Sequence, residues 1–452
     1  MVRFPTPMLK PKDHGAASRT DPTGAARVIV VGGGFAGVYA ARRLERLLPP
    51  AVAEITMISA TDHLCYSPLL PEVAAGRLDP RRIAVPLRTV LPRARILQGV
   101  VDDVDVENRT LRVDCGSVEP LRLPWDRLVL TTGSVTRALP IPGVDRYVFG
   151  LKTLLEAQEL HAHVLRQLEE ADATTDPAER RARLTFVTVG AGYTGTETAA
   201  QLQHMTASML PDFPRLSPED LSWYLVDLAD MILPELGARL GRAALRVIRA
   251  RGMQVRLGTT VSRMTADSVT FSDGTELRTH TVIWTVGVTP PSLVQELGLP
   301  VSRGRLRVDD TLRLGEGFWA AGDTAAARDP FSSVDADYPP TAQHAQRQGV
   351  VLAHNVAASL DCGRERRYRH RDLGLVADLG GREAVARPLG IPLTGVTAKV
   401  VAKAYHLYAL PAAGNRLRVA ADWLINLVSP PVAAQLGTVP SVASEAARAT
   451  VG

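Results

Sequence analysis

The sequence of 452 residues is poor in several features that would point to particular kinds of protein. It has only three cysteines, Cys65, Cys115 and Cys362, and none of them belongs to a Cys-x-x-Cys or Cys-x4-Cys pair. This spacing speaks against a dithiol–disulfide relay. No apolar run approaches the ~20 residues of a membrane-spanning helix. The first residues lack the basic, apolar and cleavage regions of a secretory signal, so we expect a cytoplasmic protein.

Aromatic residues make up only 5% of the chain, and the net charge is only +5. The arginines are scattered rather than massed with aromatic residues, so we predict no binding of nucleic acid. A mildly basic chain fits an anionic membrane surface or nucleotide phosphates better. We also predict no metal site.

The most informative feature of the sequence is a glycine fingerprint that occurs twice. It has the form Gly-x-Gly-x-x-Gly, at Gly32, Gly34 and Gly37 and again at Gly190, Gly192 and Gly195. Each copy follows a buried-strand pattern and precedes an alanine-rich helix. The three glycines permit a tight turn, close approach of a pyrophosphate and close packing of helix on strand. Two copies indicate two dinucleotides, an arrangement that suits hydride transfer through a flavin.

The length of the chain predicts two or three domains rather than one core. We predict a β-meander at 95–131, a helix at 151–171 and a solvated linker at Asp172–Arg183. Similar strand-rich stretches follow both fingerprints, and residues 296–372 return to the first unit. This pattern predicts duplicated dinucleotide-binding domains, one inserted in the other.

Several longer segments occur in an order and spacing that chance does not explain. They include VIVVGGGFAGVYAARRL, YSPLLPEVAAGRLDPRRIAVPLR, LVLTTGS, LTFVTVGAGYTGTETAAQL, VIWTVGV, FWAAGDTAA and AQHAQRQG. On these segments the chain resembles the type II NADH dehydrogenases, which are single-subunit NADH:quinone oxidoreductases. They are flavoproteins with two dinucleotide-binding domains, and the resemblance runs from about Arg27 to Gly437.

The resemblance implies an α/β fold of two Rossmann-like domains, glutathione-reductase-like, with the NAD domain inserted in the FAD domain and a C-terminal amphipathic helical region. The expected parts are a flexible tail at 1–26, FAD-binding parts at 27–150 and 296–372, an NAD(H)-binding domain at 151–295, a C-terminal region at 373–437 and a tail at 438–452.

The resemblance also implies a set of FAD contacts. Asp323, in the Gly322-Asp323 pair, accepts hydrogen bonds from the ribityl chain, and the helix that follows points its N-terminus at the flavin ring. The alternative is a plain turn with an N-cap. Ser59 stands where an acidic residue usually holds the FAD ribose, so looser binding is expected. The remaining FAD contacts are Gly32, Gly34, Phe35, Ala36 and Gly37 of the first turn, Val101, Thr132 and Gly133.

On the nicotinamide side, Gly190, Gly192 and Gly195 bind NADH, and Asp227 matches the carboxylate that binds the ribose diol and repels a 2′-phosphate. A turn aspartate is the alternative. Glu197 matches a glutamate near nicotinamide and flavin, and a helix-dipole partner on the first turn of its helix is the alternative. Gly287 is expected to line the nicotinamide pocket.

The acceptor side carries a departure from the family pattern. The family has Ala-Gln-x-x-x-Gln at the start of the helix facing the flavin, and this chain keeps Gln343 but has Arg347 in place of the second glutamine. Arginine brings a permanent charge and a bidentate fork. It can bind a quinone carbonyl, select an anionic substrate, or form a surface salt bridge.

Two C-terminal stretches have amphipathic patterns. In Val396–Leu410 we expect Lys399, Lys403 and His406 to form one polar stripe with an apolar face opposite. In Arg416–Val428 a broad apolar face is expected. Such helices fit peripheral binding to an anionic membrane on the cytoplasmic face. Packing on the protein's own core or in a homodimer is the alternative.

The resemblance therefore implies an FAD-dependent oxidoreductase that transfers hydride from NADH to the flavin and then two electrons to a quinone near Gln343. A soluble flavin oxidoreductase acting on a specialised metabolite is one alternative, motivated by Arg347 and Ser59. A non-enzymatic redox-sensing flavoprotein that resembles apoptosis-inducing factor is another.

Overall fold

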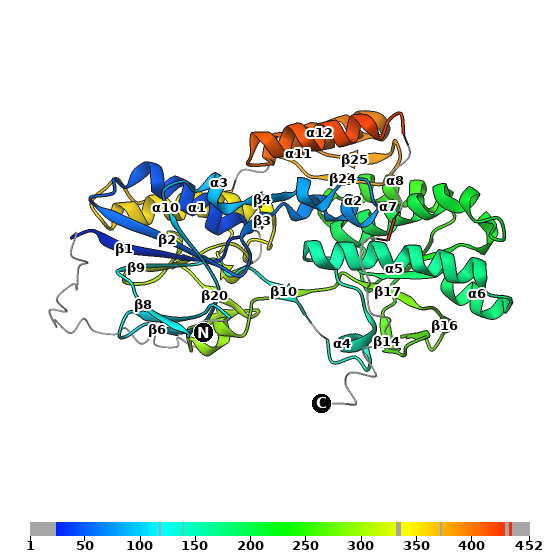
Figure 1. The fold of residues 1–452 in the computed structure, drawn as a ribbon, viewed down its shortest axis with the longest axis horizontal. Coiled ribbons are helices and arrows are strands. Elements are labelled where there is room, and N and C mark those ends of the chain that lie inside the picture. The colour runs from blue at the N-terminus through cyan, green and yellow to red at the C-terminus, as the bar shows by residue number, and fades with distance from the viewer. Residues whose placement is uncertain are drawn as a thin grey trace, which may run out of the picture.

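The computed structural model describes residues 24–116, 119–137, 139–330, 336–370, 373–429 and 434–435. The predicted tail at 438–452 and most of the tail at 1–26 lie outside the described residues. Two lobes lie side by side, and a C-terminal layer covers one side of the pair (Figure 1). In the described part, no helix is long and apolar enough to cross a membrane.

The first lobe is built on a six-stranded sheet in the order β21-β22-β9-β1-β2-β5. Strand β1 (Ala26–Val31) lies parallel between β2 (Ala53–Ser59) and β9 (Arg127–Leu130). Its apolar run is buried, as both faces of a parallel sheet usually are. Strand β22 (Phe318–Ala320) pairs in parallel with β9. Because strands from before and after the second lobe in the sequence share this sheet, the predicted insertion of one domain in the other is confirmed.

Helices α1 (Phe35–Leu47) and α10 (Ala342–Ala358) pack against each other in this lobe. A Cβ at Gly349 would lie 2.2 Å from the carbonyl oxygen of Ala36, so only glycine permits this approach. Strands β6 (Val100–Asp105), β7 (Thr110–Asp114) and β8 (Leu121–Pro124) form a separate antiparallel meander.

The predicted boundaries of that meander, 95–131, are too wide. Strand β5 (Arg95–Gln98) pairs in parallel with β2 at the edge of the main sheet, and β9 lies inside that sheet. Apolar strands of this length carry no sequence signal that separates a sheet strand from a meander strand.

The second lobe repeats the plan with a four-stranded parallel sheet. Its order is β13 (Gln254–Leu257), β12 (Ser222–Asp227), β11 (Thr185–Val189) and β17 (Thr281–Trp284). The helices of this lobe are α5 (Leu154–Ala173), α6 (Pro177–Arg183), α7 (Tyr193–Met209) and α8 (Ala238–Ala250). A second meander consists of β14 (Val261–Met264), β15 (Ser268–Phe271) and β16 (Glu276–Arg278).

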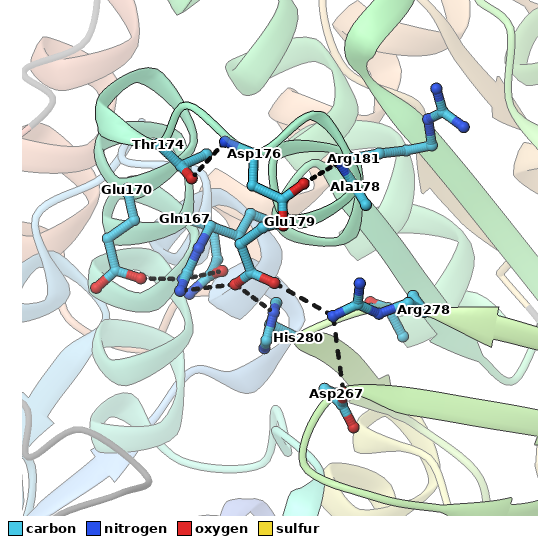
Figure 2. A network of polar contacts seen from close by, with 12 residues as sticks. Gln167, Glu170, Thr174, Asp176, Ala178, Glu179, Arg181, Asp267, Arg278 and His280 are labelled. Carbon is cyan, nitrogen blue, oxygen red and sulfur yellow. Dashed lines mark hydrogen bonds and ion pairs between the residues drawn. The ribbon is translucent and has the colours of Figure 1, made fainter.

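The prediction of a solvated linker at Asp172–Arg183 is wrong, because most of this segment is helical. Helix α6 begins after Asp176, whose carboxylate caps it by accepting the backbone N–H of Ala178 at 2.8 Å. Glu179 then pairs with Arg278 of the second meander at 3.3 Å. Figure 2 shows this network joining α5, α6 and the meander. The polar residues that suggested a linker are thus fixed by mutual ion pairs.

Strand β10 (Val135–Thr136) pairs antiparallel with β18 (Val288–Thr289), so the two segments that connect the lobes lie side by side (Figure 1). The other short elements are α2 (Leu70–Ala74), α3 (Leu87–Val90), α4 (Val144–Tyr147), α9 (Leu293–Glu296), β3 (His63–Cys65), β4 (Ala84–Pro86), β19 (Val301–Ser302), β20 (Arg305–Arg307), β21 (Arg313–Gly315) and β23 (Ala325–Ala326).

The C-terminal layer combines a small sheet with two helices. Strands β24 (Val376–Asp378), β25 (Ala384–Ala386) and β26 (Leu393–Thr394) are antiparallel. Helix α11 (Gly395–Ala409) packs on this sheet, and α12 (Ala413–Ile425) lies against α11. The two predicted helices are therefore present, and in Figure 1 they form the outermost layer of the molecule.

Candidate functional site

In the first glycine turn, two glycines are required by close packing and the middle glycine borders open space. Gly32 has φ +108°, and a Cβ there would lie 2.1 Å from the carbonyl oxygen of Thr131. A Cβ at Gly37 would lie 1.9 Å from the carbonyl oxygen of Gly32. Beside Gly34, in contrast, nothing lies within 4 Å of an added Cβ. Helix α1 starts there at Phe35 without a side-chain cap, and the open space beside Gly34 fits a pyrophosphate at this helix N-terminus.

The second turn repeats this geometry. Gly190 has φ +107°, and a Cβ at Gly195 would lie 1.8 Å from the carbonyl oxygen of Gly190. Nothing lies within 4 Å of a Cβ at Gly192, and helix α7 also starts without a side-chain cap. Both turns therefore fit a dinucleotide phosphate in the same manner.

Each turn is also fixed by a threonine that sequence reasoning missed. The Thr131 hydroxyl donates to the carbonyl of Val31 at 2.8 Å, and the Thr285 hydroxyl donates to the carbonyl of Val189 at 2.8 Å. Each threonine directly follows the parallel strand beside the fingerprint strand. Aligning LVLTTG with VIWTVG, one segment from each lobe, would have revealed the pair.

Asp227 lies at the second glycine turn. Its carboxylate accepts the N–H of Ala191, within the turn, at 2.5 Å and the N–H of Ala229 at 2.8 Å. Strand β12, which ends at Asp227, pairs in parallel with β11, so the long segment before β12 does not displace this residue. The structure thus places an acidic group where the sequence pattern predicted one.

Asp323 lies beside the turn that contains Thr132 and Gly133. Its carboxylate accepts the Ser134 hydroxyl at 2.5 Å, and the Lys152 ammonium lies 3.6 Å away. The N–H of Gly133 donates to Thr324 Oγ1 at 2.9 Å. Sequence reasoning assigned no role to Ser134 or Lys152. Their shared contact with the Asp323 carboxylate, which joins residues of two lobes, appears only in the structure.

The long helix that follows Asp323 is α10, and it does not begin directly after this residue. Residues Gly322–Thr324 form a single 3-10 turn, and the next long helix, α10, begins only at Ala342. Gly322 has φ +74°, and its N–H donates to the Gln348 side chain of α10 at 2.7 Å. The turn and α10 are therefore linked by the Gln348 side chain, because they are not adjacent in the sequence.

The other predicted contacts lie at the edges of the two turns. The Ser59 hydroxyl is buried at the end of β2, 2.4 Å from where a Cβ at Gly33 would stand. Val101 is a buried residue of β6. Gly287, with φ +72°, precedes β18, and its carbonyl accepts the N–H of Arg137 at 3.2 Å. Gly287 thus belongs to the paired connection between the lobes.

Glu197 is held away from the helix terminus. It lies beyond the first turn of α7, which contains no acidic residue, so its interpretation as a first-turn dipole partner is wrong. Its carboxyl accepts the N–H of Asp378 at 2.7 Å. The pKa of Glu197 is raised to about 8, chiefly by burial and also by the carboxylates of Asp378 and Glu72, while that hydrogen bond and Lys399 lower it. Glu197 is therefore mostly protonated at neutral pH.

The polar stripe of α11 faces the protein rather than the solvent. Lys399 forms an ion pair with the buried Asp378, and Lys403 forms one with the buried Glu72 of α2. The indole N–H of Trp423 on α12 donates to Glu72 at 2.7 Å, and the Lys403 ammonium lies 3.9 Å from the Trp423 ring centre. Buried acids on other elements decide this orientation, and a helical pattern alone does not reveal them.

His406 completes the inward stripe. Its ring lies 3.2 Å from the Tyr66 hydroxyl, and burial lowers the pKa of His406 to about 4. Tyr66 in turn packs edge-on against Phe35 of the first glycine turn, with ring centres 5.7 Å apart. The C-terminal layer thus contacts the first glycine turn through one aromatic residue.

At the start of α10, Gln343 and Arg347 lie one helical turn apart. The Gln343 amide donates to the carbonyl of Gly374 at 3.0 Å, and Arg347 lies 2.9 Å from the His370 ring. Burial raises the pKa of Tyr405 on α11, whereas Arg347 and a hydrogen bond with Gln343 lower it. The side chains of Gln343, Arg347 and Tyr405 therefore converge between α10 and α11.

Comparisons with known proteins agree with this geometry. Residues 26–349 match the model of the pyridine nucleotide-disulphide oxidoreductase family. The type II NADH:quinone oxidoreductase NdhA of Mycobacterium tuberculosis is 29% identical over 418 residues, covering 89% of this chain and 87% of that protein. The demethylphylloquinone reductase NdbB of Synechocystis is 30% identical, covering 88% of this chain and 95% of that protein. A structure of NDH2 from Plasmodium falciparum in complex with NADH has a TM-score of 0.82 at 17% identity, covering 90% of this chain and 99% of that chain, which supports the fold.

Proposed function

Because the chain belongs to the pyridine nucleotide-disulphide oxidoreductase family, we propose that it is an FAD-dependent NADH dehydrogenase that reduces a quinone. The observation that carries this proposal is the presence of two complete glycine turns in one chain, each with open space beside its middle glycine. The names of the relatives in Mycobacterium tuberculosis and Synechocystis support the choice of donor and acceptor. When bound, FAD would supply the hydride and two-electron chemistry that connects NADH to the acceptor.

The first lobe would hold FAD. The N–H groups at the start of α1 would bind its pyrophosphate, and Asp323 would accept hydrogen bonds from its ribityl hydroxyls. Ser134 and Lys152 orient the Asp323 carboxylate for this task. The buried Ser59 hydroxyl offers the ribose a weaker bond than a carboxylate would. Val101, Thr132 and Gly133 complete this set as proposed contacts.

The second lobe would hold NADH. The start of α7 would bind the pyrophosphate, and Asp227 would bind the ribose diol while repelling the 2′-phosphate of NADPH. Glu197, mostly protonated at neutral pH, adds little negative charge beside an anionic cofactor. Gly287 keeps the connection between the lobes compact next to the nicotinamide.

The acceptor would bind where Gln343, Arg347 and Tyr405 converge. The Gln343 amide and the Arg347 guanidinium are both hydrogen-bond donors, and a quinone presents carbonyl oxygens that accept such bonds. Replacing Gln343 with Ala should raise the KM for quinone without slowing flavin reduction by NADH. The matched control, Gln295→Ala on the exposed face of α9, should change neither quantity. Slower flavin reduction in Gln343→Ala, or an unchanged KM, would contradict this placement.

We also propose that the C-terminal layer lies on a membrane surface. With the polar stripe of α11 turned inward, large apolar side chains point outward, and we call this set the C-terminal apolar face. It comprises Val396, Val400 and Tyr408 of α11, Leu417, Leu424 and Ile425 of α12, and Leu427 and Val428. Leu417 is 73% exposed and Val428 is 89% exposed. A group of large apolar side chains with such exposure is typical of helices that lie on a membrane and is uncommon on a surface that contacts only water.

A liposome flotation assay tests the C-terminal apolar face. Replacing Leu417 and Leu424 with Ser should reduce binding to neutral phosphatidylcholine vesicles, because apolar insertion needs no charge. The control replaces Leu155 and Val301, which are exposed on other elements, with Ser. Equal binding by both variants would contradict membrane contact. If the wild-type protein does not bind vesicles and is a dimer, and the Leu417→Ser/Leu424→Ser variant is a monomer while the control variant is not, the face is a homodimer interface instead.

A further inference from the structure

Helix α8 of the second lobe presents a row of arginines that the proposed reaction does not use. Its buried residues, Leu240, Gly241, Ala244 and Ile248, define the inner face. At about 100° per residue, the opposite face carries the exposed arginines Arg239, Arg242, Arg246 and Arg249. These four positions are spaced by three and four residues, so their charges lie next to one another along the helix.

These arginines differ from the other basic residues of the same lobe. On α6, Arg183 pairs with Glu179 of its own helix at 2.9 Å, and Glu179 also pairs with Arg278 (Figure 2). Within the part of the chain that the structure describes, the four α8 arginines form no ion pair, and the one side-chain hydrogen bond among them joins Arg249 to the carbonyl of Val255.

The placement of these charges does not favour the helix itself. Arg239 lies in the first turn of α8, where the helix dipole repels positive charge, and only Arg249, in the last turn, has a favourable position relative to the dipole. Neighbouring like charges along one face repel each other as well. A row of cations that receives no compensation within the protein is suited to an external anionic surface.

The position of α8 relative to the C-terminal layer identifies that surface. Arg387, at the end of β25, donates to the carbonyls of Glu235 and Leu236, immediately before α8, at 3.0 and 3.4 Å. The next residues include Leu389 and Ile391, which are 70% and 60% exposed. They lead directly into α11 and the C-terminal apolar face. Helix α8 therefore lies next to the C-terminal layer, beside the segment that leads to the C-terminal apolar face (Figure 1).

We propose that the α8 arginine row binds the headgroups of anionic phospholipids and anchors the nucleotide-binding lobe to the bilayer. The inference rests on the proposed membrane contact of the C-terminal apolar face and adds a second, electrostatic contact from a different domain. Arginine suits this role because its planar fork binds phosphate oxygens in pairs. The C-terminal apolar face supplies insertion, and the α8 row supplies the preference for negative charge.

The test compares two full-length variants that lose the same number of charges. One carries Arg239→Gln, Arg242→Gln, Arg246→Gln and Arg249→Gln, which preserves helix propensity. The control carries Arg146→Gln, Arg263→Gln, Arg303→Gln and Arg307→Gln, at exposed residues that form no ion pair in the described part of the chain. Reduction of a short-tailed quinone with NADH reports that both variants are folded.

Partitioning is measured on vesicles of phosphatidylcholine alone and of phosphatidylcholine with phosphatidylglycerol, at low and high salt. One basic residue near an anionic membrane strengthens binding on the order of fivefold. The α8 variant should therefore lose roughly tenfold or more of its affinity for the anionic vesicles, together with most of its salt dependence. Its affinity for neutral vesicles should equal that of wild type.

The outcomes separate the two contacts. Equal losses in the α8 variant and its control would overturn the α8 proposal while leaving the C-terminal apolar face untouched. If the wild-type protein does not bind neutral vesicles, the proposal for the C-terminal apolar face is contradicted. The comparison of the two variants on anionic vesicles would still test the α8 row. A duplex DNA probe is included, and loss of DNA binding without loss of vesicle binding in the α8 variant would overturn the proposal in favour of nucleic acid.

Discussion

The replacement Glu197→Gln should change how the stability of the protein depends on pH. The pKa of Glu197 is raised from 4.5 to about 8, chiefly by burial, so the folded protein retains a proton that the unfolded chain releases. Between these two values the folded state binds more protons than the unfolded state, and its stability therefore falls as the pH rises. Below pH 4.5 the residue is neutral in both states and adds no pH dependence.

The magnitude follows from the size of the shift. Each pKa unit corresponds to about 1.4 kcal/mol, so the full shift corresponds to at most roughly 5 kcal/mol, lost across pH 4.5 to 8. Glutamine cannot ionise, yet its side-chain carbonyl can still accept the N–H of Asp378. The free energy of unfolding of Glu197→Gln should therefore exceed that of the wild type increasingly as the pH rises.

The assay is urea denaturation of both proteins at a series of pH values from 5 to 9, at equal FAD occupancy. The free energies of unfolding of the wild type and the variant are compared at each pH. The other titrating groups occur in both proteins, so their contributions cancel in the difference between the two curves. Parallel curves over this range would refute the reasoning, because they would mean that Glu197 titrates at its ordinary pKa in the folded protein.

Three further predictions concern the proposed sites and the C-terminal layer. Asp323→Ala should give folded protein with little bound flavin, measured by absorbance after gel filtration; full flavin occupancy would remove Asp323 from the site. Asp227→Ser should bring the kcat/KM for NADPH closer to that for NADH, because the carboxylate no longer repels the 2′-phosphate; an unchanged ratio would show that Asp227 does not read the ribose. Lys403→Met leaves Glu72 buried without its cation, so urea denaturation should show a loss of about 3–5 kcal/mol. A loss below 1 kcal/mol would show that this ion pair does not fasten the layer.

The sequence predicted those parts of the fold that depend on local rules. The two glycine turns and the strands beside them follow from steric needs within a few residues of each fingerprint. The inserted second domain was predicted instead from the similar strand-rich stretches after both fingerprints and from the return of residues 296–372 to the first unit. Asp227 was predicted because it ends the apolar strand after the second fingerprint, and the parallel pairing of β12 with β11 brings that strand end to the glycine turn.

The parts that sequence reasoning missed depend on contacts between distant segments. The sequence predicted the polar stripe of α11 but not the direction it faces, and it faces inward because Glu72 and Asp378 lie buried beneath it. Likewise, Lys152 gains its place only through contact with Asp323 of the other lobe. No spacing within one helix encodes such partners, so a helical pattern predicts that there are two faces without saying which of them is buried.

The central claim is that the chain carries electrons from NADH to a quinone through a bound flavin. One absorbance experiment under anaerobic conditions tests it most directly, with purified protein scanned alone, after addition of NADH, and again after addition of menadione. The account predicts a flavin spectrum that NADH bleaches within seconds and that menadione restores in full. A flavin that stays bleached in the presence of menadione, or a protein that binds no flavin at all, would contradict the account.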